Sequence, residues 1–228
     1  MAYPPPHAST VRSSGLRKPP FSAANPARLV VIISGAGRTL LNLHEATRDG
    51  RLPSARITGV ISSSPPGSEG FERARALGGG GGGGAAVPVV HLPGHPTAAA
   101  LEQLVMELGG DYIVLAGYLK RLEVPASLAG RIVNIHPALL PDFGGKGMYG
   151  RRVHEAVLAS GVAVSGCTVH LVDSEYDHGP VLLRRTCPVL DGDTPETLAA
   201  RVFQVEREAY VEAIGTLLAG RTVLEAAK

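Results

Sequence analysis

The chain has 228 residues, of which 44% are hydrophobic and 18% charged, so one domain with a large core and some appendages is expected. A net charge of +2, 4% aromatic residues and no tryptophan argue against nucleic acid or an anionic membrane surface as a partner. No apolar run reaches the roughly 18 residues that a membrane span needs. Cys167 and Cys187 lack metal-ligand spacing, and a reduced pair in the cytoplasm is favoured over a single disulfide.

Two stretches are predicted to lie outside the packed part of the chain. Residues 1–27 are rich in proline, serine, alanine and arginine and lack the apolar segment of a secretory signal, so a flexible tail is favoured over a transit peptide. The seven glycines at 78–84 carry no side chains to pack, which indicates an expanded surface loop and not a phosphate cradle. The domain itself is expected over residues 28–228.

From residue 28 onward, strand-like and helix-like patterns alternate. Strands are predicted at 28–33, 56–61, 87–91, 112–115, from 131, at 166–172 and at 181–189. Helices are predicted from 40 to Gly50, at 71–77, 97–108 and 152–160, and from Pro195, where Thr194 is the expected cap. Such alternation is typical of an α/β fold, here a single-domain, mostly parallel twisted sheet with helices on both faces.

The first strand ends in the turn Ser34-Gly35-Ala36-Gly37-Arg38-Thr39, and a helix follows. A strand, a Gly-x-Gly turn and a helix together aim backbone N–H groups and a positive helix end at an anion. Leu40 stands where a dinucleotide site has its third glycine, so a single phosphate is the better fit. A tight turn without a ligand explains the glycines about as well.

The fifth strand carries Asn134 and His136 in alternation with Val133 and Ile135, so both polar side chains share one face. Pro137 ends the strand. An amide donor and an imidazole at the carboxyl end of a strand can polarise a carbonyl oxygen, and ligands of open α/β sheets bind at that end. For either residue alone, a strand end meeting solvent is the simpler interpretation.

Two loops follow that bear on a site. The glycine-rich loop 142–150 is predicted to be a mobile cover or an ordinary surface connection. The loop 173–180 contains three acids, Asp173, Glu175 and Asp177. Without convergent histidines or further acids, a metal site is not expected there.

Four motifs resemble the folate-dependent phosphoribosylglycinamide formyltransferase family, also called glycinamide ribonucleotide transformylases. They are ISGAGRTLLNL, VLAGYLKRL, VNIHPALLPDF and TVHLVDSEYDHGPVL, and the resemblance covers about residues 28–218. It implies a Rossmann-like formyltransferase fold and the catalytic set Asn134, His136 and Asp177. It also implies substrate-binding roles for Gly35, Ala36, Gly37, Arg38, Thr39 and Glu206. The folate pocket would involve Tyr118, Leu119, Lys120, Arg121, Leu122, Asn134 and Asp173.

The chain departs from the family pattern at Arg38-Thr39, where many members have Ser-Asn, and at Lys120 and Arg121, where arginine and an apolar residue are common. The resemblance implies formyl transfer from 10-formyltetrahydrofolate to the amine of glycinamide ribonucleotide in purine biosynthesis. The alternatives are a folate-dependent formyltransferase for another amine, such as an amino sugar, and a non-catalytic nucleotide-binding module. The expected partners are small molecules, without nucleic acid, membrane or metal, in a monomer or homodimer.

Overall fold

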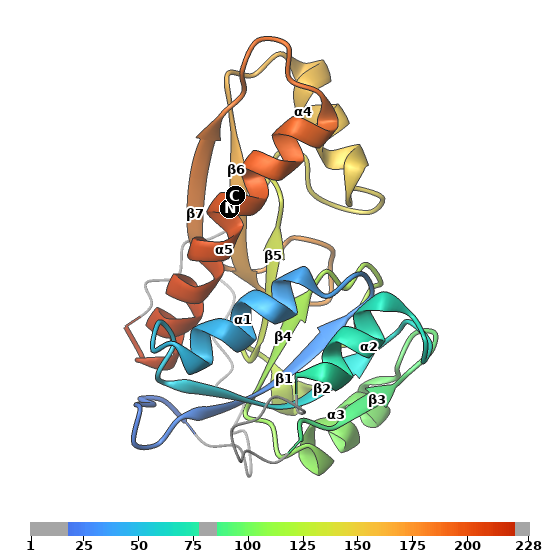
Figure 1. The fold of residues 1–228 in the computed structure, drawn as a ribbon, viewed down its shortest axis with the longest axis vertical. Coiled ribbons are helices and arrows are strands. Elements are labelled where there is room, and N and C mark those ends of the chain that lie inside the picture. Colours follow the sequence, from blue (N-terminus) through green and yellow to red (C-terminus); the bar gives the residue numbers. More distant parts are fainter. Residues whose placement is uncertain (1–17, 78–85, 222–228) are drawn as a thin grey trace, which may run out of the picture.

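The computed structural model describes residues 18–77 and 86–221. It contains one seven-stranded sheet with the order β3-β2-β1-β4-β5-β6-β7 (Figure 1). The strands are β1 (Ala27–Ile33), β2 (Ala55–Ser62), β3 (Val89–His91), β4 (Tyr112–Ala116), β5 (Ile132–His136), β6 (Val164–Leu171) and β7 (Val181–Pro188). The first five strands pair in parallel, whereas β6 runs antiparallel to both β5 and β7.

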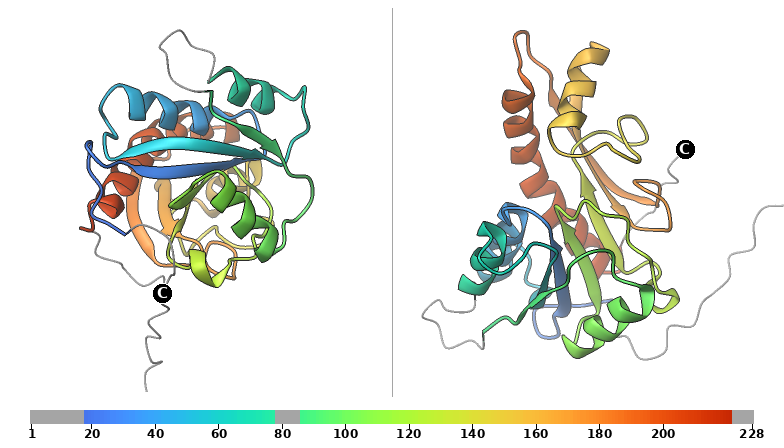
Figure 2. Two further views of the ribbon diagram at one scale, coloured as in Figure 1. Left: turned by 90° about the horizontal axis from the view of Figure 1, so that it is seen from below. Right: turned by 90° about the vertical axis from the view of Figure 1, so that its right-hand side faces the viewer.

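Helices cover both faces of the sheet, as the two views of Figure 2 show. They are α1 (Arg38–Arg48), α2 (Glu69–Ala76), α3 (Ala98–Glu107), α4 (Arg151–Ser160) and α5 (Pro195–Leu218), with a short 3-10 turn at Ala126–Leu128. Side chains from α1, α2, α4 and α5 form one core with Leu29, Val31 and Ile33. Val30 and Ile32 point the other way, into a second core with α3. The continuous apolar run of β1 is therefore explained by burial on both faces.

The predicted fold, a single mostly parallel sheet with helices on both faces, is confirmed. The antiparallel β6–β7 pair is the part that strand and helix patterns did not specify. In Figure 1, α4, the far ends of β6 and β7 and the first turns of α5 project beyond the parallel strands. Among the helices of the described residues, none is long and apolar enough to cross a membrane.

The domain begins earlier than the predicted boundary at residue 28. Phe21 is buried, its ring meets that of Tyr112 edge to face at a centroid distance of 6.2 Å, and its backbone N–H donates to Leu218 O at 2.8 Å. Phe21 and Ala27 thus belong to the packed domain, although residues 22–25 between them are exposed, and the tail prediction is corrected to that extent. The single apolar residue Phe21 has no periodic context in the sequence, so its burial could not be inferred. The predictions for 1–17 and for the glycine run 78–84 lie outside the described residues.

The long helix α5 is fastened to the strand ends that carry the site. Thr194 caps it by accepting from the N–H of Thr197, and Pro195 occupies its first position, as predicted. The buried hydroxyl of Tyr210 lies 2.7 Å from Leu115 O on β4 and 3.0 Å from Val133 O on β5. A buried hydroxyl with carbonyl partners of this kind fixes the position of α5 relative to the two strands.

Candidate active site

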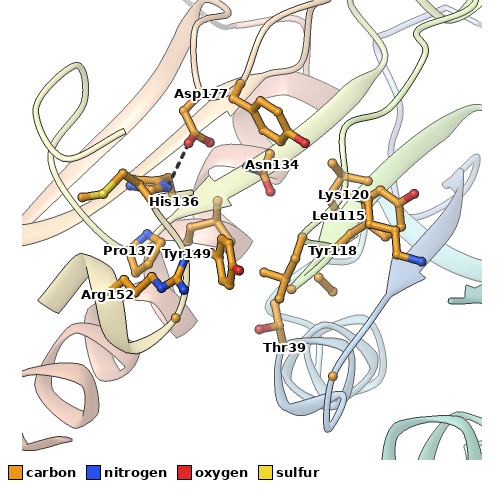
Figure 3. Close-up of a pocket in the computed structure, with 18 of the residues that line it drawn as sticks. Thr39, Leu115, Tyr118, Lys120, Asn134, His136, Pro137, Tyr149, Arg152 and Asp177 are labelled. Carbon is orange, nitrogen blue, oxygen red and sulfur yellow. Dashed lines mark ion pairs between the residues drawn. The ribbon is translucent and has the colours of Figure 1, made fainter. Parts of the chain in front are cut away.

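A cavity of about 760 Å³ opens at the carboxyl ends of the parallel strands. All residues for which the family resemblance implied a role line this one cavity, on elements far apart in the chain. They are Gly35, Ala36, Gly37, Arg38, Thr39, Tyr118, Leu119, Lys120, Arg121, Leu122, Asn134, His136, Asp173, Asp177 and Glu206. Figure 3 shows Thr39, Tyr118, Lys120, Asn134, His136 and Asp177 around the cavity. A volume of this order accommodates an organic ligand, and the position follows the rule for open α/β sheets.

Asn134 and His136 stand on one face at the end of β5. Antiparallel pairing places His170 of β6 opposite Asn134, and the Asn134 amide nitrogen lies 3.2 Å from His170 Nε2. His170 Nδ1 donates to Leu171 O at 2.9 Å, which leaves its Nε2 as the acceptor for one N–H of Asn134. The amide retains its second N–H, which can serve a ligand.

His136 is 3% exposed and contacts two acceptors. Its Nε2 lies 2.8 Å from Phe143 O, and its Nδ1 lies 3.4 Å from Asp177 Oδ2 (dashed line in Figure 3). The N–H of Gly145 also donates to Asp177 Oδ2, at 3.0 Å. The loop after β5 therefore contacts both members of the pair, and both ring nitrogens of His136 face acceptors.

Burial and charge act in opposite directions on this pair. Burial lowers the pKa of His136, and the anion of Asp177 opposes that shift without cancelling it. Burial alone would raise the pKa of Asp177, but the proximity of His170, the charge of His136 and the N–H of Gly145 bring the pKa below its usual range. Asp177 is consequently ionised at neutral pH, and it makes the protonated form of His136 more accessible than burial alone would.

The turn after β1 is held in shape by α2. Gly37 has φ +75°, a left-handed conformation that glycine adopts without strain, and it leads directly into α1. A Cβ on Gly70 of α2 would lie 1.9 Å from Gly35 O, so only glycine permits this close approach. Arg73 of α2 donates to Ala36 O. Arg38 and Thr39, the first residues of α1, line the cavity, and the N–H groups at the start of a helix can bind an anion.

Glu206 and Arg38 line the same part of the cavity from α5 and α1. The guanidinium of Arg38 lies over the ring of Phe203, 4.4 Å from its centroid. Burial raises the pKa of Glu206 to about 7, against the field of Arg38. A carboxyl group that is partly neutral at physiological pH can both donate and accept, which suits hydroxyl groups of a ligand.

A further wall is formed by the segment after β4 and the loop after β6. Lys120 Nζ donates to Gly94 O at 3.1 Å, and Arg121 Nε donates to Ser174 O at 3.0 Å. Asp173 Oδ2 lies 2.8 Å from His178 Nδ1. The buried Tyr118 hydroxyl has no hydrogen-bond partner among the described residues, which leaves it available to a ligand.

Two histidines that line the cavity were given no role from the sequence. His170 stands on the same face as Thr168 and Val172, a visible alternation, but its position opposite Asn134 depends on antiparallel pairing that the pattern did not reveal. His154 of α4 is buried at the cavity wall, and its Nδ1 has no partner within residues 18–77 and 86–221. Its spacing on α4 is that of an ordinary core residue, so no sequence pattern indicated a role for it. Over the described parts of the chain, no group of three or more His, Cys, Asp or Glu side chains could hold a metal ion.

With this fold and cavity, the sequence matches the family model described as formyl transferase over residues 27–214. The chain belongs to the formyl transferase family. It is 41% identical over 204 residues to a chloroplastic phosphoribosylglycinamide formyltransferase of Vigna unguiculata, with 86% of this chain and 62% of the relative covered. It is 38% identical over 209 residues to phosphoribosylglycinamide formyltransferase of Mycobacterium tuberculosis, with 89% and 88% covered.

Solved structures agree with this assignment. Glycinamide ribonucleotide transformylase 1 from Symbiobacterium toebii superposes with a TM-score of 0.76 at 36% identity, covering 89% of this chain and 92% of that one. The chain spans 65% and 62% of the length of the chloroplastic relatives from Arabidopsis thaliana and Vigna unguiculata. The plant relatives thus contain sequence that this chain does not match.

Proposed function

We propose that the protein transfers the formyl group of 10-formyltetrahydrofolate to the amine of glycinamide ribonucleotide, a step of purine biosynthesis. One observation carries the proposal: Asn134, His136 and Asp177 meet in a single cavity with the Gly35–Thr39 turn. A phosphate at the turn and a reacting amine near His136 can then belong to one acceptor molecule. The names of the relatives support the same acceptor.

The formyl group is amide-like, so attack by the amine moves charge onto the formyl oxygen. The free N–H of Asn134 is available to that oxygen, because the other N–H is occupied by His170. Loss of one such donor costs roughly a hundredfold to a thousandfold in rate. No covalent nucleophile is required, and the two cysteines are both buried away from the described chemistry.

His136 is proposed to act with Asp177 as one unit. Protonated, the imidazole is a charge-assisted donor for the formyl oxygen, and Asp177 balances its charge. Its Nε2 donates to Phe143 O in the structure, so the loop carbonyl must give way before that N–H reaches a ligand. Asp177 also accepts the proton that the amine releases, directly or through water, and this proton passes to the folate nitrogen as the bond between that nitrogen and the formyl carbon breaks.

The cavity wall formed by Tyr118, Leu119 and Leu122 with Val172 is apolar, and the unpartnered Tyr118 hydroxyl lies within it. This mixture suits a flat ring system with a few polar edges, so we assign the pterin end of the folate to this wall. Lys120, Arg121 and Asp173 are assigned to its rim. Glu206 is assigned to the ribonucleotide.

The purified protein should therefore form N-formylglycinamide ribonucleotide when it is incubated with the two substrates. Detection of this product tests the proposal. The same assay with amino sugars as acceptors distinguishes this reaction from formyl transfer to another amine. The assay with water as the acceptor distinguishes it from hydrolysis of the donor. Binding of the ribonucleotide without any transfer would establish the nucleotide-binding module instead. Formylation of an amino sugar in preference to the ribonucleotide would replace the proposed acceptor. A cytoplasmic location and a monomeric or homodimeric state belong to the same proposal.

A further inference from the structure

The side chain of Arg38 is held in an unusual position for the first residue of a helix. Its guanidinium carbon lies 4.4 Å above the centroid of the Phe203 ring, so a residue of α1 is stacked on a residue of α5. Both residues line the active-site cavity. Stacking on an aromatic face restricts a side chain that is otherwise flexible, and it leaves the N–H edge of the guanidinium available for hydrogen bonds.

Arg38 also lacks the partner that a structural arginine normally has. No carboxylate within the described ranges forms an ion pair with it. Arg73, by contrast, forms an ion pair with Glu69 and donates a hydrogen bond to Ala36 O. The charge of Arg38 does act on one carboxyl group, because it lowers the pKa of Glu206 against the effect of burial. An exposed, oriented and unpaired cation beside an N–H-lined turn is suited to a doubly charged anion.

We propose that Arg38 binds the phosphate of the acceptor through its side chain, and that Phe203 positions Arg38 for this contact. The inference rests on the proposed function, because it takes the acceptor to be a phosphate monoester. It goes beyond the backbone contacts of the Gly35–Thr39 turn, since it assigns a side chain from α1 and a positioning ring from α5. The turn and the guanidinium then hold the phosphate from two sides.

The neighbourhood supports a dianion at this position. Glu206 lines the cavity within the influence of Arg38, and its raised pKa of about 7 means that it is partly uncharged at neutral pH. A neutral carboxyl group does not repel the phosphate. When phosphate neutralises the field of Arg38, the protonated form of Glu206 is favoured further.

The test compares two ligands, glycinamide ribonucleotide and the same riboside without its phosphate, by isothermal titration with the full-length protein. Arg38→Met keeps the length that packs on Phe203 and removes the charge. It should weaken ribonucleotide binding about tenfold or more, because a charge-assisted hydrogen bond contributes roughly 1.5–3 kcal/mol, and leave riboside binding within about twofold. Arg38→Lys should restore part of the loss.

Phe203→Leu should reduce the same preference by about two- to fivefold, the size of an exposed cation–π contact, and Phe203→Tyr should restore it. Arg48→Met removes an exposed charge from the other end of α1, outside the cavity, and should change neither affinity. Equal weakening of both ligands by Arg38→Met, or none, would overturn the assignment of Arg38. If the wild-type protein transfers formyl groups but does not prefer the phosphorylated ligand, this inference fails alone. If it neither binds nor formylates the ribonucleotide, the proposed function fails with it.

Discussion

Asp177 Oδ2 lies 3.4 Å from His136 Nδ1, and the two side chains are only 11% and 4% exposed. An anion and an imidazole that are shielded together interact more strongly than they would in water. The same carboxylate lies 3.7 Å from His170 Nε2 through its other oxygen. Asp177 therefore faces two histidines, one from β5 and one from β6.

Asp177→Asn should lower the pKa of His136 further. Burial already lowers this pKa, and Asp177 is the largest opposing influence. Removing an opposite charge at this distance is expected to shift the pKa down by about one unit. Nuclear magnetic resonance titration of the His136 imidazole measures it directly. An unchanged or raised pKa would show that Asp177 does not stabilise the imidazolium.

Gly37→Val should raise the Michaelis constant for the ribonucleotide by about tenfold or more and leave folate binding nearly unchanged. The valine side chain would strain the left-handed turn, at φ +75°, and obstruct the N–H groups that face the anion. Gly50→Val is the matched control, because Gly50 has φ +86° at the other end of α1 and does not line the cavity. Steady-state kinetics with each substrate varied would separate the effects, and equal damage to both substrates would count against a phosphate site.

Glu206→Gln should alter how stability depends on pH. The pKa of Glu206 is raised to about 7 from 4.5, so the folded state binds its proton more tightly than the unfolded state. This contribution is fully present below about pH 4.5 and is lost as pH rises through 7. The variant should therefore gain stability relative to wild type between pH 5 and pH 8, by at most about 3 kcal/mol.

Thermal unfolding of both proteins at the two pH values checks this. Glu208→Gln removes an exposed carboxylate from the same helix and controls for the lost charge. A stability difference between the Glu206 variant and wild type that is the same at both pH values would mean that Glu206 titrates normally.

Phe21→Ala should destabilise the protein by about 3 kcal/mol, as expected for a buried phenylalanine. Phe21 is 5% exposed and packs on Tyr112, at the start of β4. Leu190→Ala, at a side chain that is 52% exposed, should have a much smaller effect. Chemical denaturation gives the free energy of unfolding of both variants. If they differ by less than about 1 kcal/mol, residues 18–27 are a dispensable tail.

Particular residues show how far the sequence could predict the fold and the site. The run at 28–33 and the alternation at Asn134 and His136 were sufficient for a sheet with polar chemistry at its carboxyl end, because burial and strand period leave a local signature. The sequence context of Asp177 was sufficient to predict that it lies in a loop. Its contact with His136, however, is determined by the fold. The contact depends on where β6 pairs with β5, which no local pattern records.

The parts that were not predicted share this non-local origin. His170 becomes a partner of Asn134 only through antiparallel pairing. Phe143 meets His136 through its backbone carbonyl, so its side-chain identity carried no information about the contact. The stack brings together Arg38 of α1 and Phe203 of α5, which are 165 positions apart in the sequence. Helix periodicity describes Arg38 and Phe203 separately and does not indicate that they are in contact.

The most direct test of the account is single-turnover formyl transfer by Asn134→Ala, His136→Ala, Asp177→Asn and the double variant of His136 and Asp177, with folding checked by circular dichroism. Asn134→Ala should slow turnover about a hundredfold, and His136→Ala at least as much. The double variant should be little slower than the worse single variant, because groups that act as one unit are not additive. A loss in the double variant equal to the product of the single losses, or near-normal turnover by His136→Ala, would contradict the proposed active site.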